Sequence, residues 1–145
     1  MKKKRFCNIV FCLYGALMLI LLFDRAGYDP SKPYAEQLQY NLVPFETIRL
    51  FWRLLQSGSP GLRRHAVINL VGNVVMFIPL GFLLPKVSPR QRRLWRTLLT
   101  TALIIVLVEM LQLFSLRGSC DVDDLILNVL GAAIGYGVYR IFGKK

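Results

Sequence analysis

Two polar side chains interrupt a largely apolar run of this chain, and their spacing places them on one face of a helix. Glu109 and Gln112 lie within residues 98–116, a run long enough to cross a hydrocarbon core about 30 Å thick. Residues three apart are neighbours on a helix. A carboxylate inside a spanning helix costs roughly 2.5 to 3.5 kcal/mol on insertion scales, so it is a candidate for function. Such groups can bind a polar headgroup or move a proton.

The segment that follows adds more polar groups. A short loop holds Asp121, Asp123 and Asp124. The next apolar run carries Asn128, four residues after Asp124 and therefore on the same helical face. Asp121 or Asp123 can instead cap the start of this helix, because a carboxylate accepts hydrogen bonds from the first backbone N–H groups. Capping does not account for Glu109, which stays a candidate for a site.

Another apolar run, residues 66–84, carries Asn69 and Asn73 one turn apart. If this helix and the Asn128 helix run inward while the Glu109 helix runs outward, their polar side chains reach a similar depth. We therefore predict a polar cavity that opens outward. Its candidate ligand-binding residues are Asn69, Asn73, Glu109, Gln112, Arg117, Asp121, Asp124 and Asn128. Small and amide residues also let membrane helices pack and hydrogen-bond each other, so a purely structural role stays open.

Composition and charge indicate a membrane protein. Hydrophobic residues make up 54% of the chain and the mean hydropathy is +0.46, which lies outside the range of ordinary soluble domains. The net charge of +11 is concentrated in clusters without acids at alternate ends of the apolar runs. By the positive-inside rule, these clusters mark the cytoplasmic face. This distribution argues against a nucleic-acid partner. The clusters comprise Lys2, Lys3, Lys4, Arg5, Lys86, Arg90, Arg92, Arg93, Arg96, Arg140, Lys144 and Lys145.

The apolar runs predict a single all-α domain over residues 1–145, a bundle of four transmembrane helices with both termini inside. We expect the helices at about 6–23, 66–84, 97–116 and 125–142, the outer loops at 24–65 and 117–124, and the inner loop at 85–96. Within the first outer loop, residues 44–56 set apolar side chains at helical spacing opposite arginines. This pattern predicts a short helix on the outer membrane surface, and a lid packed on the bundle is the alternative.

Smaller features indicate how the helices pack. Gly131 and Gly135 have the small-xxx-small spacing that lets another helix approach closely. Pro79 can kink its helix and free a carbonyl one turn earlier, which a neighbouring helix can satisfy. The three cysteines, Cys7, Cys12 and Cys120, show neither disulfide nor metal-ligand spacing. Asp121, Asp123 and Asp124 could hold a hard cation with water, but little else supports a metal site, and we expect no metal and no cofactor.

Four motifs in one order give the chain a resemblance to the VanZ-like family of bacterial membrane proteins. They are NLVPFETI at 41–48, two asparagines followed by FIPLGFLLP within 69–85, E-x2-Q at 109–112, and DVDDLILNVLGAAIGY at 121–136. The family's polar motif also tends to carry a basic residue before the aspartates, and Arg117 is the candidate for it here. The resemblance implies a multi-pass protein of the bacterial cytoplasmic membrane. It also implies a phenotype, since the founding member confers low-level resistance to the antibiotic teicoplanin.

Two classes of function compete on these observations. In the first, the outward cavity binds or shields a membrane lipid or a lipid-linked cell-wall precursor, and it affects the glycopeptide antibiotic only indirectly. In the second, the protein is an enzyme acting on an outer-leaflet lipid or glycan carrier, with Glu109 and either Asp123 or Asp124 as acid and base. The only histidine, His65, stands near a helix start and completes no Ser/His/Asp set. A transporter or scaffold is the third option, and as a transporter this short chain would require a homo-oligomer.

Overall fold

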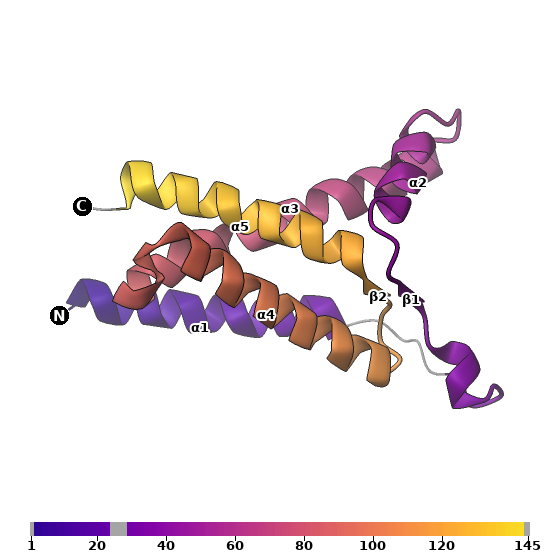
Figure 1. The fold of residues 1–145 in the computed structure, drawn as a ribbon, viewed down its shortest axis with the longest axis horizontal. Coiled ribbons are helices and arrows are strands. Elements are labelled where there is room, and N and C mark those ends of the chain that lie inside the picture. The colour runs from indigo at the N-terminus through magenta and orange to yellow at the C-terminus, as the bar shows by residue number, and fades with distance from the viewer. Residues whose placement is uncertain (1, 24–28, 144–145) are drawn as a thin grey trace.

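The computed structural model describes residues 2–23 and 29–143, which form a bundle of long helices with a small group of loops and short elements at one end (Figure 1). Four helices in these residues are long and apolar enough to cross a membrane. They confirm the predicted all-α fold. In chain order the elements are α1 (Lys2–Phe23), η1 (Tyr34–Gln37), β1 (Tyr40–Asn41), α2 (Glu46–Leu55), α3 (Pro60–Val87), η2 (Pro89–Arg92), α4 (Leu94–Phe114), β2 (Cys120–Asp121) and α5 (Val122–Phe142).

All four long helices start earlier than the apolar runs suggest, and the starts of α3 and α5 have a local cause. α3 begins at Pro60, inside the expected outer loop, because a proline in the first helical turn lacks only an N–H that would have no partner there. It also continues through Pro85 to Val87, which shortens the expected inner loop to η2 and the residues beside it. α5 begins at Val122 because the Asp121 side chain accepts a hydrogen bond from the helix's first turn.

The closest helix contact joins α3 and α5, and glycines make it possible. A Cβ atom added to Gly131 would lie 2.0 Å from a carbonyl oxygen of α3, and one added to Gly135 would lie 1.9 Å from another. A Cβ atom on Gly81 of α3 would lie 1.9 Å from a carbonyl oxygen of α5. No side chain fits at such distances. The close approach that the spacing of Gly131 and Gly135 predicts is therefore present, and Gly81 is its counterpart on α3.

The buried apolar core lies between α3 and α4, and α1 packs on its outside. Tyr14 of α1 contacts this core, and its hydroxyl donates a hydrogen bond of 2.8 Å to the carbonyl oxygen of Met76. Pro79 has no N–H to donate to the preceding turn of α3. The carbonyl that loses its helical donor at Pro79 is that of Val75, one residue before the carbonyl that the tyrosine binds. The core residues are Phe77, Leu80, Leu84 and Ile105.

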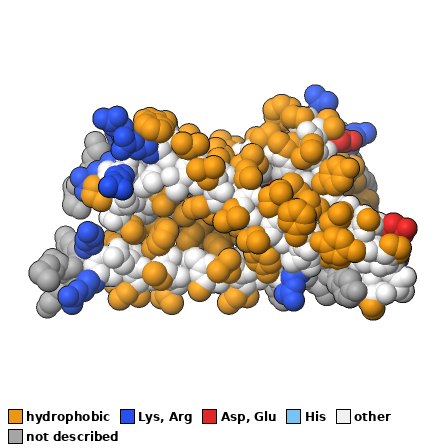
Figure 2. All heavy atoms as spheres, turned by 60° about the horizontal axis from the view of Figure 1, so that its bottom comes forward, with side chains coloured by type: hydrophobic (Ala, Val, Ile, Leu, Met, Phe, Trp, Pro, Cys, Tyr) orange, Lys and Arg blue, Asp and Glu red, His pale blue; other side chains and the backbone are white. Residues whose placement is uncertain are grey.

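The two ends of the bundle differ in charge. α1 begins and α5 ends at one end, whereas α2, β1 and β2 lie at the other (Figure 1). Lysine and arginine side chains gather at the first end, and hydrophobic side chains cover much of the surface between the ends (Figure 2). At the basic end, a hydrogen bond joins α5 to η2: the Tyr136 hydroxyl donates to the carbonyl oxygen of Arg92 at 2.7 Å. This is the surface pattern of a multi-pass membrane protein.

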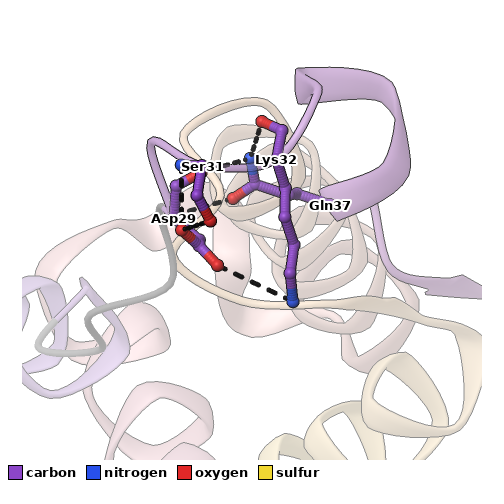
Figure 3. Close-up of polar contacts among 4 residues, drawn as sticks. All are labelled: Asp29, Ser31, Lys32 and Gln37. Atoms are coloured by element: carbon purple, nitrogen blue, oxygen red, sulfur yellow. Dashed lines mark hydrogen bonds and ion pairs between the residues drawn. The ribbon is translucent and has the colours of Figure 1, made fainter.

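A compact polar turn precedes β1 at the opposite end (Figure 3). The Asp29 carboxylate accepts hydrogen bonds from the hydroxyl and the backbone N–H of Ser31, at 2.6 and 3.0 Å, and these bonds lower the pKa of Asp29. The Gln37 amide binds the backbone N–H and carbonyl of Asp29 and the carbonyl of Lys32. Lys32 pairs with Asp29 at 3.7 Å. Side-chain bonds therefore shape the chain that leads into β1.

Candidate functional site

A short parallel pair of strands brings the segment between α1 and α3 against the α4–α5 connection. Tyr40 pairs with Cys120, and Asn41 pairs with Asp121. The Cys120 N–H donates to the carbonyl oxygen of Gln39 at 3.0 Å. No sequence pattern predicts this pairing. It places the segment that precedes α2 directly beside the acidic residues at the start of α5.

Asp121 links three helices at this point. Its side chain is nearly buried, with the residue 8% exposed, and both carboxylate oxygens have donors. Oδ1 accepts from the Asp123 N–H at 2.8 Å, which makes Asp121 the N-cap of α5 as the sequence allowed. Oδ2 accepts from the Thr47 hydroxyl of α2 at 2.6 Å. The Asp121 N–H in turn donates to Oε2 of Glu109 on α4 at 3.1 Å.

Asp123 caps a different helix from its own. It is fully buried, and its two oxygens accept from the backbone N–H groups of Phe45 and Ile48 at 2.6 and 2.9 Å. These groups begin α2, which has no side-chain cap from within its own sequence. Helix N-termini favour negative charge because their first N–H groups lack partners. Asp123 therefore fixes the start of α2 to the start of α5.

The backbone at the start of α2 is strained in a way that serves this contact. Phe45 has φ 67° and ψ 7°, a left-handed conformation that costs a residue other than glycine of order 1 to 3 kcal/mol. Pro44 precedes it, and the Glu46 N–H donates to the carbonyl of Val43 at 3.4 Å to close the turn. This turn holds the Phe45 N–H where the Asp123 carboxylate accepts it.

Gln112 and Arg117 donate hydrogen bonds to the C-terminal end of α1. Gln112 is buried on α4, and its Nε2 donates to the carbonyl oxygen of Leu22 at 2.7 Å. The exposed Arg117 donates to the carbonyl oxygen of Phe23 at 3.3 Å. The last carbonyls of a helix have no partner within the helix. These two predicted site residues thus bind the C-terminal end of α1.

The three predicted asparagines have different surroundings. The Asn73 amide of α3 donates to Oδ1 of Asp124 on α5, which ties these two helices together. The Asn69 amide donates to the carbonyl oxygen of His65 at 2.9 Å, one turn earlier on its own helix, so Asn69 has a local partner. Asn128 is 4% exposed. Its Oδ1 has no hydrogen-bond partner in the part of the chain that the structure describes.

Cys120 lies beside the carboxylates in β2. Burial raises the pKa of its thiol, and the negative charges of Glu109 and Asp121 raise it further. The thiolate is the reactive form of cysteine. The neutral thiol is therefore favoured at neutral pH, which makes Cys120 a weak nucleophile.

Two side chains at this end were not among the predicted site residues. Asn41 donates to the Thr47 hydroxyl at 2.9 Å, and Thr47 donates to Asp121. Both lie in the NLVPFETI motif, which indicated that the segment mattered but gave no partner for it. No local spacing connects residue 47 with residue 121, so only the fold reveals the contact.

Comparison with known proteins agrees with this architecture. A family model described as VanZ/LLP1 matches residues 10–143. Searches of curated proteins and of solved structures found no match to this chain. The matched range contains the strand pair, α2 and all the residues considered above for the site. This chain belongs to the VanZ/LLP1 family.

Proposed function

We propose that this protein binds the polar headgroup of a membrane lipid, or of a lipid-linked component of the cell envelope, at the bundle end where α2 meets α5. We place it in the bacterial cytoplasmic membrane with both termini inside. The concentration of lysine and arginine at the end where α1 begins and α5 ends supports this orientation (Figure 2). The candidate site then lies on the side of the outer leaflet.

The observation that carries the proposal is the unpaired oxygen of Asn128. A buried polar atom without a partner costs roughly 1 to 3 kcal/mol, so a donor is expected to occupy such a position. An amide oxygen accepts from a hydroxyl or an ammonium group. Sugars and several lipid headgroups carry these donors. Asp124 lies one turn away on the same helix and is held by Asn73, so the polar surroundings are ordered before any ligand arrives.

The hydrogen bonds of the aspartates favour binding over catalysis. A general acid or base needs an oxygen within hydrogen-bond reach of the substrate. Both oxygens of Asp123 are occupied by backbone N–H groups, and both oxygens of Asp121 are occupied by its neighbours. Each oxygen of these two carboxylates thus already has a donor within the protein. Resistance to a lipoglycopeptide would then arise indirectly, through shielding of a target in the outer leaflet.

Lipid retention by an Asn128→Leu variant tests the proposal. Leucine has a similar shape and removes the acceptor, and Asn69→Leu is the matched control because its amide is bound within its own helix. Native mass spectrometry of the purified proteins would identify the bound lipids. We expect one species to be retained by the wild type and the control, and retained about tenfold less by Asn128→Leu, as for the loss of one hydrogen bond.

Two further results of this experiment decide between the functions. Thermal stability in detergent separates a ligand role from a structural one: Asn128→Leu should be at least as stable as the wild type, since it removes an unpaired buried acceptor. Equal lipid retention by all three proteins would refute the proposal. A new covalent lipid or glycan species that disappears in Glu109→Gln cells would replace binding with catalysis.

A further inference from the structure

The outer surface around α2 is strongly basic, although the residues outside the cytoplasmic clusters nearly balance in charge. Arg49 and Arg53 lie one turn apart on α2, and Arg63 and Arg64 lie near the start of α3. All four are exposed. The only acid between residues 46 and 65 is Glu46. These four residues, Arg49, Arg53, Arg63 and Arg64, are called the outer arginine surface below.

The acids that would balance this charge lie inside the protein. Outside the cytoplasmic clusters the chain has seven basic and eight acidic residues, which nearly cancel. Glu109, Asp121 and Asp123 are buried, and Asp124 is half-buried and bound to Asn73. Half of the acids are thus turned inward beneath α2, while the outer arginine surface stays exposed.

Side-chain contacts fix the helices that carry these arginines. The rings of Phe51 and His65 meet edge to face, with centroids 5.6 Å apart, which packs α2 on the start of α3. Asp123 and Thr47 fix the other side of α2. The four guanidinium groups are therefore carried on helices whose relative position is set by side-chain contacts.

Exposed apolar side chains flank the arginines. Trp52 is 61% exposed and Leu50 46% exposed on α2, and Val43 and Phe45 just before it are 58% and 50% exposed. A soluble loop rarely exposes a contiguous group of this kind. On α2, Leu50 and Trp52 lie on either side of the stripe formed by Arg49 and Arg53. Arginine next to tryptophan and leucine suits a helix in the headgroup region.

We propose that the outer arginine surface binds the phosphate of an anionic phospholipid in the outer leaflet, while Leu50 and Trp52 enter the acyl boundary beside it. The planar guanidinium group matches phosphate with two parallel hydrogen bonds. Leu50 and Trp52 favour a lipid over a soluble anion as the ligand, because only a lipid brings acyl chains close to its phosphate to cover these side chains. This surface uses no residue of the Asn128 site, but its place in the outer leaflet rests on the orientation proposed above.

Fluorescence of Trp52 in nanodiscs tests the proposal. The full chain has two tryptophans, so Trp95→Phe leaves Trp52 as the only strong emitter. In this background, nanodiscs of phosphatidylcholine alone would be compared with nanodiscs that also contain phosphatidylglycerol. We expect phosphatidylglycerol to shift the emission of Trp52 to the blue. Arginine-to-glutamine changes in the outer arginine surface should lower the apparent affinity about fivefold for each residue replaced.

The control removes equal charge from the other end of the bundle. A variant with glutamine at Arg90, Arg92, Arg93 and Arg96 should keep the full Trp52 response. A quadruple outer variant with the wild-type response would overturn the proposal. A second result would also overturn it: a polyprenyl pyrophosphate, added to phosphatidylcholine nanodiscs, shifts the Trp52 emission more strongly than phosphatidylglycerol does. Asn128→Leu should leave the Trp52 response unchanged, so failure here and failure of the proposed function give different results.

Discussion

Asp123→Ala should release α2 while the four long helices stay assembled. The substitution removes both acceptors of the Phe45 and Ile48 N–H groups. Loss of an N-cap acceptor costs about 1 kcal/mol, and each N–H left buried without an acceptor costs roughly 1 to 3 kcal/mol. Water or headgroups at this end can replace part of the loss, so we expect about 2 to 4 kcal/mol in total. The left-handed Phe45 adds to the effect, because its strain would no longer be offset by this bond.

Hydrogen–deuterium exchange of the reconstituted protein measures this release directly. A cost of 2 to 4 kcal/mol corresponds to amide exchange about 30 to 900 times faster in α2. Asp123→Asn keeps a carbonyl oxygen and should give an intermediate increase. Glu46→Gln is the control, since Glu46 is an exposed acid in the same helical turn. Amides of α3 and α5 should exchange at the wild-type rate in all variants.

The pattern of exchange would also refute the reasoning. If α2 stays protected in Asp123→Ala, then the strand pair and the Phe51–His65 contact hold it without the cap. If protection falls equally across α3 and α5, then Asp123 stabilises the whole bundle and the local interpretation is wrong. If Asp123→Ala retains α2 protection but no longer retains the bound lipid, then Asp123 acts in the site itself rather than through α2.

Three further predictions follow from packing, charge and hydrogen bonding. Gly135→Ala should lower the melting temperature in detergent strongly, because its Cβ would meet an α3 carbonyl oxygen at 1.9 Å, whereas Gly137→Ala, with open space around it, should not. Cys120, with the other two cysteines changed to serine, should react with an impermeant maleimide on intact cells if β2 faces outward. Its rate should reach half of its maximum at a higher pH than in the unfolded chain, because the pKa of the folded thiol is raised, and Glu109→Gln should lower that pH, because a negative charge that raises the pKa is removed. Tyr14→Phe should destabilise the protein by about 0.6 to 1.7 kcal/mol in thermal unfolding, as for other hydrogen bonds between membrane helices.

The long helices could be predicted from the sequence because hydrocarbon leaves few alternatives. A span requires about 20 apolar residues with every backbone group paired within the helix, and four such runs are visible. Gly131 and Gly135 likewise predict a close contact from spacing alone. Helix ends are set by local side chains, so α3 and α5 extend beyond the apolar runs to Pro60 and to the Asp121 cap.

The arrangement of the polar residues could not be predicted to the same depth. Periodicity places Glu109 and Gln112 on one face of α4, but the rotation of α4 against its neighbours decides that Gln112 binds α1 while Glu109 binds Asp121. Asp123 presents two acceptors to a helix start far away in the sequence, and no spacing rule describes that contact. Asn69 lies on the same face of α3 as Asn73, but it bonds to its own helix while Asn73 bonds to α5. The sequence does not show where the partner helix ends, so spacing alone could not separate the two asparagines.

The cap on α2 also sets an order of assembly. The carboxylate that accepts the Phe45 N–H lies 78 residues further along the chain, so it has not been synthesised when the first outer segment leaves the ribosome. Until α5 is inserted, α2 has neither its N-terminal acceptor nor the Asp121–Thr47 bond. The Phe51–His65 contact with α3 can form earlier, but it does not supply these acceptors. The second helix in the sequence is therefore the last to become fixed, and a chain truncated before Asp121 would display it uncapped.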